Sequence, residues 1–323
     1  MEKQIKIVHQ LNKWGKQKIP FVFLIDFQGK APLVFPLNEP QKEILWKIPG
    51  FSNEGELRLK AELKTWKATA VSFEKFKNGF EQVMWHIKNG DTYLLNFTQP
   101  TSIETNLTLE DIFQISSAPY KIYLKDKFVC FSPETFVKIE NGKIYSFPMK
   151  GTIDAGIENA EQIILTDSKE IAEHNTIVDL IRNDLSLVAE NVVVEKFRYL
   201  SHIQTNNKNL WQVSSLISGD LPKNYAGNIG NILFELLPAG SISGAPKKKT
   251  LEIIAKTENY ERGYYTGIFG IFDGVNLESC VLIRYIENQN GQLVYKSGGG
   301  ITFMSEAEKE YDEMLKKVYV PVA

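Results

Sequence analysis

Two acidic side chains near the end of the chain are spaced to act on one cation. Ser305 stands three residues before Glu308, a spacing that predicts a capping box at the start of a helix. In that helix Glu310 and Glu313 lie one turn apart, so both carboxylates can reach a single ion. Taken alone, a solvated acidic helix face is the simpler interpretation.

A second candidate metal ligand lies in a long helix that we expect over roughly Ser168–Glu190. Glu173 falls there among apolar residues, and a buried carboxylate needs a positive partner. Mg²⁺ is one such partner, because it binds one or two carboxylates and leaves its other positions to water and anionic substrate. An ion pair with Arg182 or Lys169 is the alternative, and from this helix alone it is the simpler one.

Two segments rich in glycine could bind an anion. The first, Gly240–Lys247, precedes a helix with a proline near its first turn, and helix N-termini favour negative charge. The second, Gly298–Gly300, ends an expected strand, and its glycines would let backbone amides approach a carboxylate closely. Either segment could equally be a tight turn, and the spacing of the first excludes a P-loop.

Three further side chains have the chemistry of a reaction site. Arg284 interrupts the apolar strand CVLIRYI, and an inward arginine would bind a carboxylate through two parallel hydrogen bonds. Lys150, in the constrained segment PMKGT, could act as a nucleophilic amine. Glu134, in the segment SPE, is a candidate general acid or base. An outward arginine or a solvated turn lysine would have no such role.

The composition excludes several classes of protein. The 323 residues carry 37 Lys+Arg and 39 Asp+Glu, a balance that argues against a nucleic-acid binder and against disorder. Only Cys130 and Cys280 occur, which excludes a disulfide framework. No apolar run approaches the roughly 18 residues of a membrane span, and no secretory signal is recognised, so we expect a cytoplasmic protein. Motifs of serine hydrolases, zinc peptidases and dinucleotide-binding proteins are absent.

Helical and extended patterns are mixed along the chain. Pro20–Phe27 predicts a buried strand, and apolar residues three and four apart over Phe73–Ile87 predict a helix. Lys121–Thr152 is typical of successive short strands, and further strands are expected over NLWQVSSLISGDL, YYTGIFGIFD, SCVLIRYIE and QLVYKSGGG. The polar stretch Asn38–Thr65 is the best candidate for a joint. This mixture predicts the α+β class.

Eight segments, in this order, resemble motifs of the chorismate-utilising enzymes: IKNGDTYLLNF, SPETF, PMKGT, EHNTIVDLIRNDL, PAGSISGAPK, ERGYYTGIFG, VLIRY and SGGGITFMSEAEKEYDEM. This family contains anthranilate synthase component I, aminodeoxychorismate synthase component I, isochorismate synthase and salicylate synthase. The similar region covers roughly residues 73–317, about three quarters of the chain. We therefore expect one catalytic domain over 1–323, with a shortened N-terminal part of about 70 residues.

The resemblance implies a sandwich of two facing antiparallel sheets flanked by helices, with a site for chorismate and Mg²⁺ between the sheets. Arg284 and Tyr265 match residues that contact the enolpyruvyl group, and the metal would hold the ring carboxylate. The metal ligands implied are Glu173, Glu310 and Glu313. The residues implied to bind substrate are Ser241, Ser243, Tyr265, Arg284, Gly298, Gly299, Gly300 and Lys317.

Lys150 separates two branches of the family. Anthranilate synthases carry a motif that resembles PIAGT, aminodeoxychorismate synthases one that resembles PIKGT, and this chain has PMKGT. The resemblance therefore implies an aminodeoxychorismate synthase component I. Lys150 would attack C2 of the ring while the C4 hydroxyl, protonated by Glu134, leaves, and ammonia would then add at C4. Because a nucleophilic amine must be deprotonated, we expect burial and nearby Mg²⁺ to lower the pKa of Lys150.

The ammonia implies a partner. Neither cysteine lies in a glycine-flanked nucleophile elbow, so the resemblance implies a separate glutamine amidotransferase, or free ammonia, and a separate lyase that makes p-aminobenzoate for folate. The alternatives are an anthranilate or isochorismate synthase and, in another class, a catalytically silent homologue that binds an amidotransferase or a carboxylate. Gln212 stands where the family carries a histidine, which disfavours anthranilate formation. The short N-terminal part argues against inhibition by tryptophan.

Overall fold

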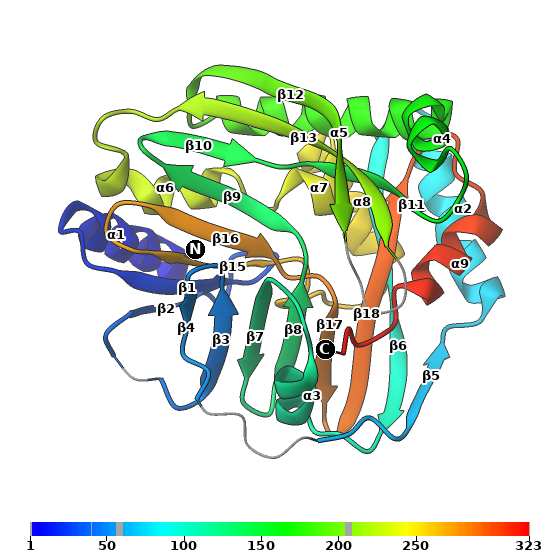
Figure 1. Cartoon of the computed structure of the whole chain (residues 1–323), viewed down its shortest axis with the longest axis horizontal. Coiled ribbons are helices and arrows are strands. Elements are labelled where there is room, and N and C mark those ends of the chain that lie inside the picture. Colours follow the sequence, from blue (N-terminus) through cyan, green and yellow to red (C-terminus); the bar gives the residue numbers. More distant parts are fainter. Residues whose placement is uncertain (1, 40, 56–60, 204–208, 323) are drawn as a thin grey trace.

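Two antiparallel sheets form the body of the molecule (Figure 1). The computed structural model describes residues 2–39, 41–55, 61–203 and 209–322, and in these residues each sheet has nine strands. In Figure 1 the strands of the first sheet run across the view, whereas those of the second run up and down. The predicted α+β class and the pair of facing antiparallel sheets are confirmed.

Each sheet combines strands from distant parts of the sequence. The first sheet contains, in spatial order, β11 (Met149–Asp154), β13 (Leu210–Asp220), β10 (Lys143–Ser146), β9 (Thr135–Glu140), β16 (Leu277–Val281), β15 (Ile268–Phe272), β1 (Phe21–Ile25) and β2 (Leu33–Pro36), and β12 (Glu190–Ile203) pairs with β13. The second contains β14 (Gly244–Ala245), β6 (Leu94–Thr105), β18 (Gln292–Ile301), β17 (Tyr285–Gln289), β8 (Phe128–Ser132), β7 (Tyr120–Leu124), β3 (Ile44–Ile48) and β4 (Phe51–Ser52), and β5 (Trp66–Ala70) pairs with β6.

Helices pack against both sheets. α5 contacts β11, β12 and β13, α2 and α8 contact β6, α9 contacts β18, α3 contacts β7 and β8, and α1 packs on α6. No helix in the described residues is long and apolar enough to cross a membrane. The helices are α1 (Glu2–Lys16), α2 (Phe73–Lys88), α3 (Leu109–Ile115), α4 (Ala160–Thr166), α5 (Ser168–Ser186), α6 (Ile229–Glu235), α7 (Gly240–Ser243), α8 (Lys247–Thr257) and α9 (Ala307–Lys316), with the short 3-10 turn η1 (Tyr225–Asn228) before α6.

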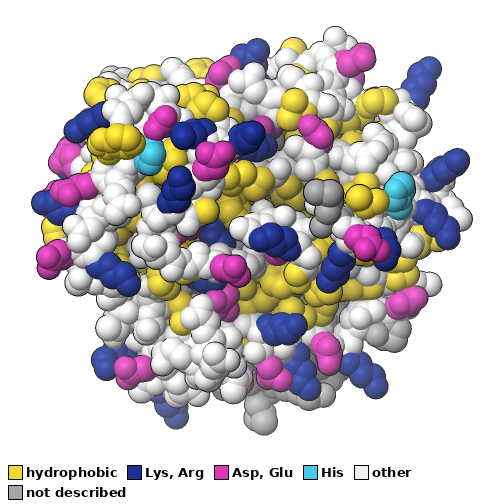
Figure 2. All heavy atoms as spheres, turned by 180° about the vertical axis from the view of Figure 1, so that it is seen from behind, with side chains coloured by type: hydrophobic (Ala, Val, Ile, Leu, Met, Phe, Trp, Pro, Cys, Tyr) yellow, Lys and Arg dark blue, Asp and Glu magenta, His cyan; other side chains and the backbone are white. Residues whose placement is uncertain are grey.

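Strand β1 is apolar throughout because both of its faces are covered. Phe21, Phe23 and Ile25 pack in the cluster that includes the helices, whereas Val22 and Leu24 pack with residues of the second sheet. Successive side chains of a strand point to opposite faces, so a strand that is covered on both faces needs an unbroken apolar run. Figure 2 shows the molecule from behind the view of Figure 1. On this face, apolar side chains gather in the middle among acidic and basic ones.

The chain crosses between the two sheets several times, and two of these crossings lie side by side. β8 lies in the second sheet and β9 in the first, and Glu134 lies in the connection between them. The predicted strand SCVLIRYIE is wrong as one element, because β16 and β17 belong to different sheets. Arg284 lies in that second connection with a left-handed φ of 55°. Hydrogen bonds join the crossings, from Val281 N to the Glu134 carbonyl and from Phe131 N to the Arg284 carbonyl, both 3.1 Å.

Other expectations about the elements need correction. The capping box at Ser305 is wrong: α9 begins at Ala307, and the Ser305 hydroxyl donates to the Glu310 carboxylate at 2.7 Å. The stretch Asn38–Thr65 is not a joint in its described part, because β3 and β4 belong to the second sheet. Helix α1 was not predicted, since its sequence is polar and its buried residue Leu11 depends on packing against α6.

Gly270 lies in β15 of the first sheet, where neighbouring atoms leave no room for a larger side chain. A Cβ there would meet the Phe23 ring and would lie 2.6 Å from the backbone oxygen of Glu278. Overpacking against backbone costs about 1–3 kcal/mol. We expect Gly270→Ala to lower the free energy of unfolding by at least about 1 kcal/mol in urea titration. Gly55→Ala is the control, because no atom lies within 4 Å of its Cβ position, and an equal loss in both variants would contradict the expectation.

Candidate active site

Two neighbouring cavities lie at the crossings. The central cavity, of about 260 Å³, is lined from both sheets, by β11 and β13 on one side and β6 and β18 on the other. The acidic cavity, of about 330 Å³, adjoins it and is lined by four glutamates, Glu170, Glu173, Glu310 and Glu313, with three lysines, Lys150, Lys169 and Lys317.

The cavities bring together almost all of the residues that the sequence predicts for the site. Ser243 is the exception, because its side chain is fully buried and its hydroxyl donates to the Ala239 carbonyl at 2.8 Å. The predicted residues that line at least one cavity are Glu134, Lys150, Glu173, Ser241, Tyr265, Arg284, Gly298, Gly299, Gly300, Glu310, Glu313 and Lys317.

Glu134 is held at its crossing by a residue of α7. The Ser241 hydroxyl donates to Glu134 Oε1 at 2.9 Å. Burial raises the pKa of Glu134, and the Ser241 hydrogen bond and the charges of Arg284, Lys317 and Lys150 oppose that rise only in part. A carboxyl group with a raised pKa keeps its proton to a higher pH, which suits a general acid.

Lys150 reaches both cavities from an irregular position in β11. The register between β11 and β13 shifts between Met149 and Thr152, and Gly151 has a φ of 80°. A bulge of this kind redirects a side chain out of the regular alternation. Lys150 Nζ donates to Glu173 Oε2 at 2.6 Å, and a quarter of the lysine side chain is exposed.

The protein groups around Lys150 do not lower its pKa, as we expected burial and Mg²⁺ together to do. Burial does lower the pKa, but the charge and hydrogen bond of Glu173, together with the charges of Glu313 and Glu170, outweigh burial and raise it. The expectation allowed for burial and Mg²⁺ but not for the four carboxylates around the acidic cavity. Lys150 is therefore held as an ammonium ion by the acidic cluster.

The three predicted metal ligands lie around the acidic cavity, but no three acidic, histidine or cysteine side chains in the described residues converge on one point. Glu173 and Glu310 are each only 5% exposed, and Lys169 Nζ lies 3.7 Å from both. The ion-pair alternative for Glu173 thus holds with Lys169 and, more closely, with Lys150. Arg182 instead contacts Asp179.

Two glycines of β18 make room beside the acidic residues. A Cβ on Gly298 would overlap backbone atoms of β6, while one on Gly299 would lie 3.4 Å from Glu310 Oε2 and 3.5 Å from Glu313 Oε1. Lys317 Nζ donates to Glu313 Oε1 at 2.6 Å and to the Gly298 carbonyl at 2.8 Å. Both carboxylates therefore face the same glycine, and hard oxygen donors of this type suit Mg²⁺.

The central cavity has the charge of an anion site. Arg284 lines this cavity, and its Nε is buried and has no hydrogen-bond partner among the described residues. The cationic side chains outnumber the carboxylates, four to two: Lys150, Arg284, Lys296 and Lys317 against Glu134 and Glu313.

Lys296 was missed by the sequence analysis. It is 1% exposed, lies 2.8 Å from the Glu287 carboxylate, and donates to the carbonyls of Glu261 and Arg262. Its only signal in the sequence is a charged residue inside the apolar strand QLVYKSGGG, directly before the glycines. A strand covered on both faces gives no alternation from which its direction could be predicted.

Comparison with known proteins now assigns the family. The chorismate binding enzyme family matches residues 41–323. The chain belongs to this family. Chorismate is the substrate of the family, and a ring that carries carboxylates agrees with the cationic excess of the central cavity.

Similarity to individual relatives does not decide which activity of the family this chain has. A PabA-like protein of Pasteurella multocida is 50% identical over 320 residues, and the match covers 98% of each chain. Anthranilate synthase component 1 of Acetivibrio thermocellus is 31% identical, over 94% of this chain and 64% of that protein. Aminodeoxychorismate synthase component 1 of Bacillus subtilis is 30% identical, over 88% and 62%. These identities do not separate the two activities.

A solved structure supports the fold. The 2,3-dihydroxybenzoate-specific isochorismate synthase of Bacillus anthracis superposes with a TM-score of 0.70. The match covers 97% of this chain and 86% of that chain, at 20% sequence identity. At that identity the likeness concerns the fold alone.

Removing the hydrogen bond from Ser241 should change the pKa of Glu134. Donation from the hydroxyl stabilises the charged carboxylate and so lowers the pKa of Glu134. We expect Ser241→Ala to move the titration of Glu134 to higher pH, measured from the carboxyl carbon shift by NMR. Ser243→Ala, in the same helical turn but without contact to Glu134, should leave it unchanged. A shift to lower pH in Ser241→Ala would contradict this account.

Proposed function

We propose that this protein is an aminodeoxychorismate synthase component I, which converts chorismate and ammonia into 4-amino-4-deoxychorismate and water. The observation that carries the proposal is the position of Lys150, whose side chain reaches the cationic cavity that Glu134 also lines. An alanine at position 150, as in the anthranilate synthase motif, could not form a covalent adduct. The product would go to p-aminobenzoate and folate through a separate lyase.

In the first step, the neutral Lys150 amine forms a bond to C2 of the chorismate ring. Both ring double bonds shift, from C1–C2 to C1–C6 and from C5–C6 to C4–C5, and the bond between C4 and its hydroxyl oxygen breaks. Glu134 donates the proton that lets this oxygen leave as water, which is the role that a raised carboxyl pKa favours. A good leaving group is needed because hydroxide leaves poorly at neutral pH.

In the second step, ammonia forms a bond to C4, both double bonds shift back, and the bond between C2 and Lys150 Nζ breaks. Glu134, now a carboxylate, takes the proton that the added ammonia loses. Lysine leaves as a neutral amine, so both groups return to their starting states. Two allylic displacements place the amine at C4, para to the ring carboxylate.

The residues of the central cavity position the anionic substrate. Arg284 would bind the enolpyruvyl carboxylate through its guanidinium, with Tyr265 beside it in the cavity wall. Backbone amides at Gly298–Gly300 and the Ser241 turn would complete carboxylate binding. Ser243 would stabilise that turn through its hydrogen bond to the Ala239 carbonyl and would not touch the substrate.

Glu173, Glu310 and Glu313 would hold Mg²⁺, since all three present hard oxygen donors to the acidic cavity. When bound, the ion would neutralise these carboxylates, which is the change that the raised pKa of Lys150 requires, and would bind the ring carboxylate. Ammonia would come from a glutamine amidotransferase partner, as the relatives named aminodeoxychorismate synthase component 1 suggest.

Anthranilate synthase is the second candidate, because a relative of that name is as similar as the aminodeoxychorismate synthase. The products distinguish the two. We expect the purified protein with chorismate, Mg²⁺ and ammonium to form a non-fluorescent amino product that an added lyase converts to p-aminobenzoate. Fluorescent anthranilate, or isochorismate formed without ammonia, would overturn the assignment but not the family.

Lys150 is the residue to change in that assay. Removal of a covalent nucleophile should lower kcat by at least about 100-fold, so we expect Lys150→Ala to lose amination by that factor or more. Lys138→Ala is the control, because this partly exposed lysine of β9 lies outside both cavities. Amination at full rate by Lys150→Ala would exclude the covalent route.

The metal ligands can be tested by titration with Mg²⁺. We expect chelation with EDTA to abolish turnover and excess Mg²⁺ to restore it. Glu310→Gln should raise the Mg²⁺ concentration needed for half-maximal rate by at least about tenfold. Glu306→Gln is the matched control, because Glu306 precedes the same helix but is exposed and pairs with Lys309. Equal Mg²⁺ dependence in the two variants would remove Glu310 from the metal site.

A further inference from the structure

Regular pairing between strands does not fix the position of Lys150. The register of β11 against β13 shifts between Met149 and Thr152, and in the described strands neither Lys150 nor Gly151 pairs with a residue of β13. Gly151 also has a left-handed φ of 80°. At such a bulge the regular ladder is interrupted, so other contacts must hold the side chain in one direction. The structure supplies these contacts on both sides of Lys150.

The segment is supported just before and just after Lys150. Before it, the backbone N–H of Ser215, in β13, donates to the Pro148 carbonyl at 3.0 Å. After it, Gly151 packs against α4, because a Cβ at this glycine would lie 3.3 Å from the Ile164 side chain. The position of Lys150 therefore depends on where Ser215 and α4 lie.

One buried hydroxyl joins those two supports. The Ser215 side chain is 0% exposed, and its Oγ accepts from the backbone N–H of Arg198 at 2.9 Å. The Arg198 guanidinium donates to the carbonyls of Ile164, at 3.1 Å, and Leu165, at 2.8 Å, near the end of α4. The contacts on both sides of Lys150 thus lead to Ser215.

His174, in α5, is the other partner of this hydroxyl. His174 Nε2 lies 2.7 Å from Ser215 Oγ, and the histidine is 1% exposed. The second ring nitrogen, Nδ1, is buried and has no hydrogen-bond partner in the part of the chain that the structure describes. The contact with Ser215 is therefore what fixes the ring, and it ties α5 to β13.

His174 also follows Glu173, the partner of Lys150, directly in α5. Lys150 Nζ donates to Glu173 Oε2 at 2.6 Å, and this contact joins β11 to α5. It can form only at one separation of the two elements. The bond between His174 and Ser215 spans the same gap, from α5 to the strand that pairs with β11.

From these contacts we propose that His174 is a positioning residue for Lys150 and acts through the hydroxyl of Ser215. The proposal rests on the proposed function, which makes Lys150 the nucleophile. A displacement of a reacting group by about 1 Å can cost about 100-fold in rate. His174 lines neither the central nor the acidic cavity, so it acts without touching the substrate.

Chemical labelling of lysines tests the position of Lys150 without any substrate. The probe is acetic anhydride at one fixed pH, and the modified peptides are quantified by mass spectrometry. We expect Lys150 to be modified at least threefold faster in His174→Asn than in the wild type, because the loosened amine leaves Glu173 and becomes more exposed. Lys138, outside both cavities, is the internal reference. An unchanged ratio of Lys150 to Lys138 labelling would overturn the proposal.

Two amide variants distinguish the hydrogen bond from packing. A glutamine amide reaches as far as His174 Nε2 and can donate or accept, whereas an asparagine amide reaches only as far as Nδ1. With chorismate, ammonium and Mg²⁺, we expect kcat to fall at least tenfold in His174→Asn but to stay within threefold of the wild type in His174→Gln. KM for chorismate should change less than twofold in both, and equal losses of kcat would overturn the proposal.

His202→Asn is the matched control for these variants. It changes a histidine of β12 that packs on Trp211, and neither residue lines the two cavities. We expect its kcat and its Lys150 labelling to match the wild type. A tenfold loss of kcat in this control would show that any change near β13 disturbs the site, and would overturn a specific role for His174.

Ser215→Ala tests the same contact from its other side. We expect the double variant with His174→Asn to have the kcat of Ser215→Ala alone, because both changes break one hydrogen bond. Losses that multiply would show that the two residues act independently and would overturn the proposal. Thermal unfolding verifies that each variant folds.

The measurements separate this proposal from the proposed function. Labelling needs no reaction, and chorismate consumption is measured whatever the product. Formation of anthranilate would therefore overturn the assigned activity while the labelling ratio still decides the position of Lys150. Faster labelling with an unchanged kcat would confirm the contact but overturn its role in catalysis.

Discussion

The site depends on two hydrogen-bonded crossings between the sheets, one from β8 to β9 and one from β16 to β17. Backbone groups in a buried crossing need hydrogen-bond partners, and here the crossings satisfy each other through Val281 with Glu134 and Phe131 with Arg284. A residue at a crossing is free of the strict alternation of a strand, and the side chains at both of these crossings line the central cavity. The proposed acid and the proposed anion ligand therefore owe their positions to the architecture itself.

The charges at the site balance one another with one exception. Lys150 pairs with Glu173 and Lys317 pairs with Glu313, so these groups are not left as isolated buried charges, which are costly. Arg284 differs, because in the described residues it forms no ion pair: its guanidinium lies 5.6 Å from the Tyr319 ring centroid, and its Nε has no hydrogen-bond partner. An anionic substrate can neutralise the charge of Arg284 directly. Near Lys150, however, the substrate would meet carboxylates that already raise the pKa of the amine and so keep it protonated. Any use of Lys150 as a nucleophile requires that network to change first.

From the sequence, the residues that line the cavities could be predicted better than the pKa values of those residues. Glu173 and Lys150 stand out because charged residues in apolar or glycine-bounded segments need a reason to be there. The raised pKa of Lys150 could not be foreseen, because Glu173 and Glu313 are distant in sequence and meet Lys150 only in the fold. The failed capping box at Ser305 has the same cause: the hydroxyl has a tertiary partner in Glu310. Periodicity likewise gives no sign that a strand changes sheets at Arg284.

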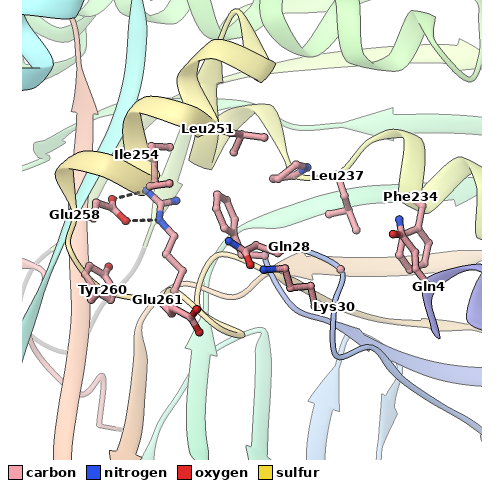
Figure 3. Close-up of a pocket in the computed structure, with 15 residues that line it drawn as sticks. Gln4, Gln28, Lys30, Phe234, Leu237, Leu251, Ile254, Glu258, Tyr260 and Glu261 are labelled. Carbon is pink, nitrogen blue, oxygen red and sulfur yellow. Dashed lines mark hydrogen bonds and ion pairs between the residues drawn. The ribbon is translucent and has the colours of Figure 1, made fainter. Parts of the chain in front are cut away.

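The buried pair of Glu258 and Arg262 joins the end of α8 to the wall of the central cavity (Figure 3). Glu258 also accepts from the backbone N–H and the hydroxyl of Thr98, so α8's end, β6 and the Ile242 turn share one hydrogen-bonded unit. Removing one partner of such a pair costs about 3–5 kcal/mol, because an uncompensated charge is left behind. The unit therefore resists local loosening and should move as a whole.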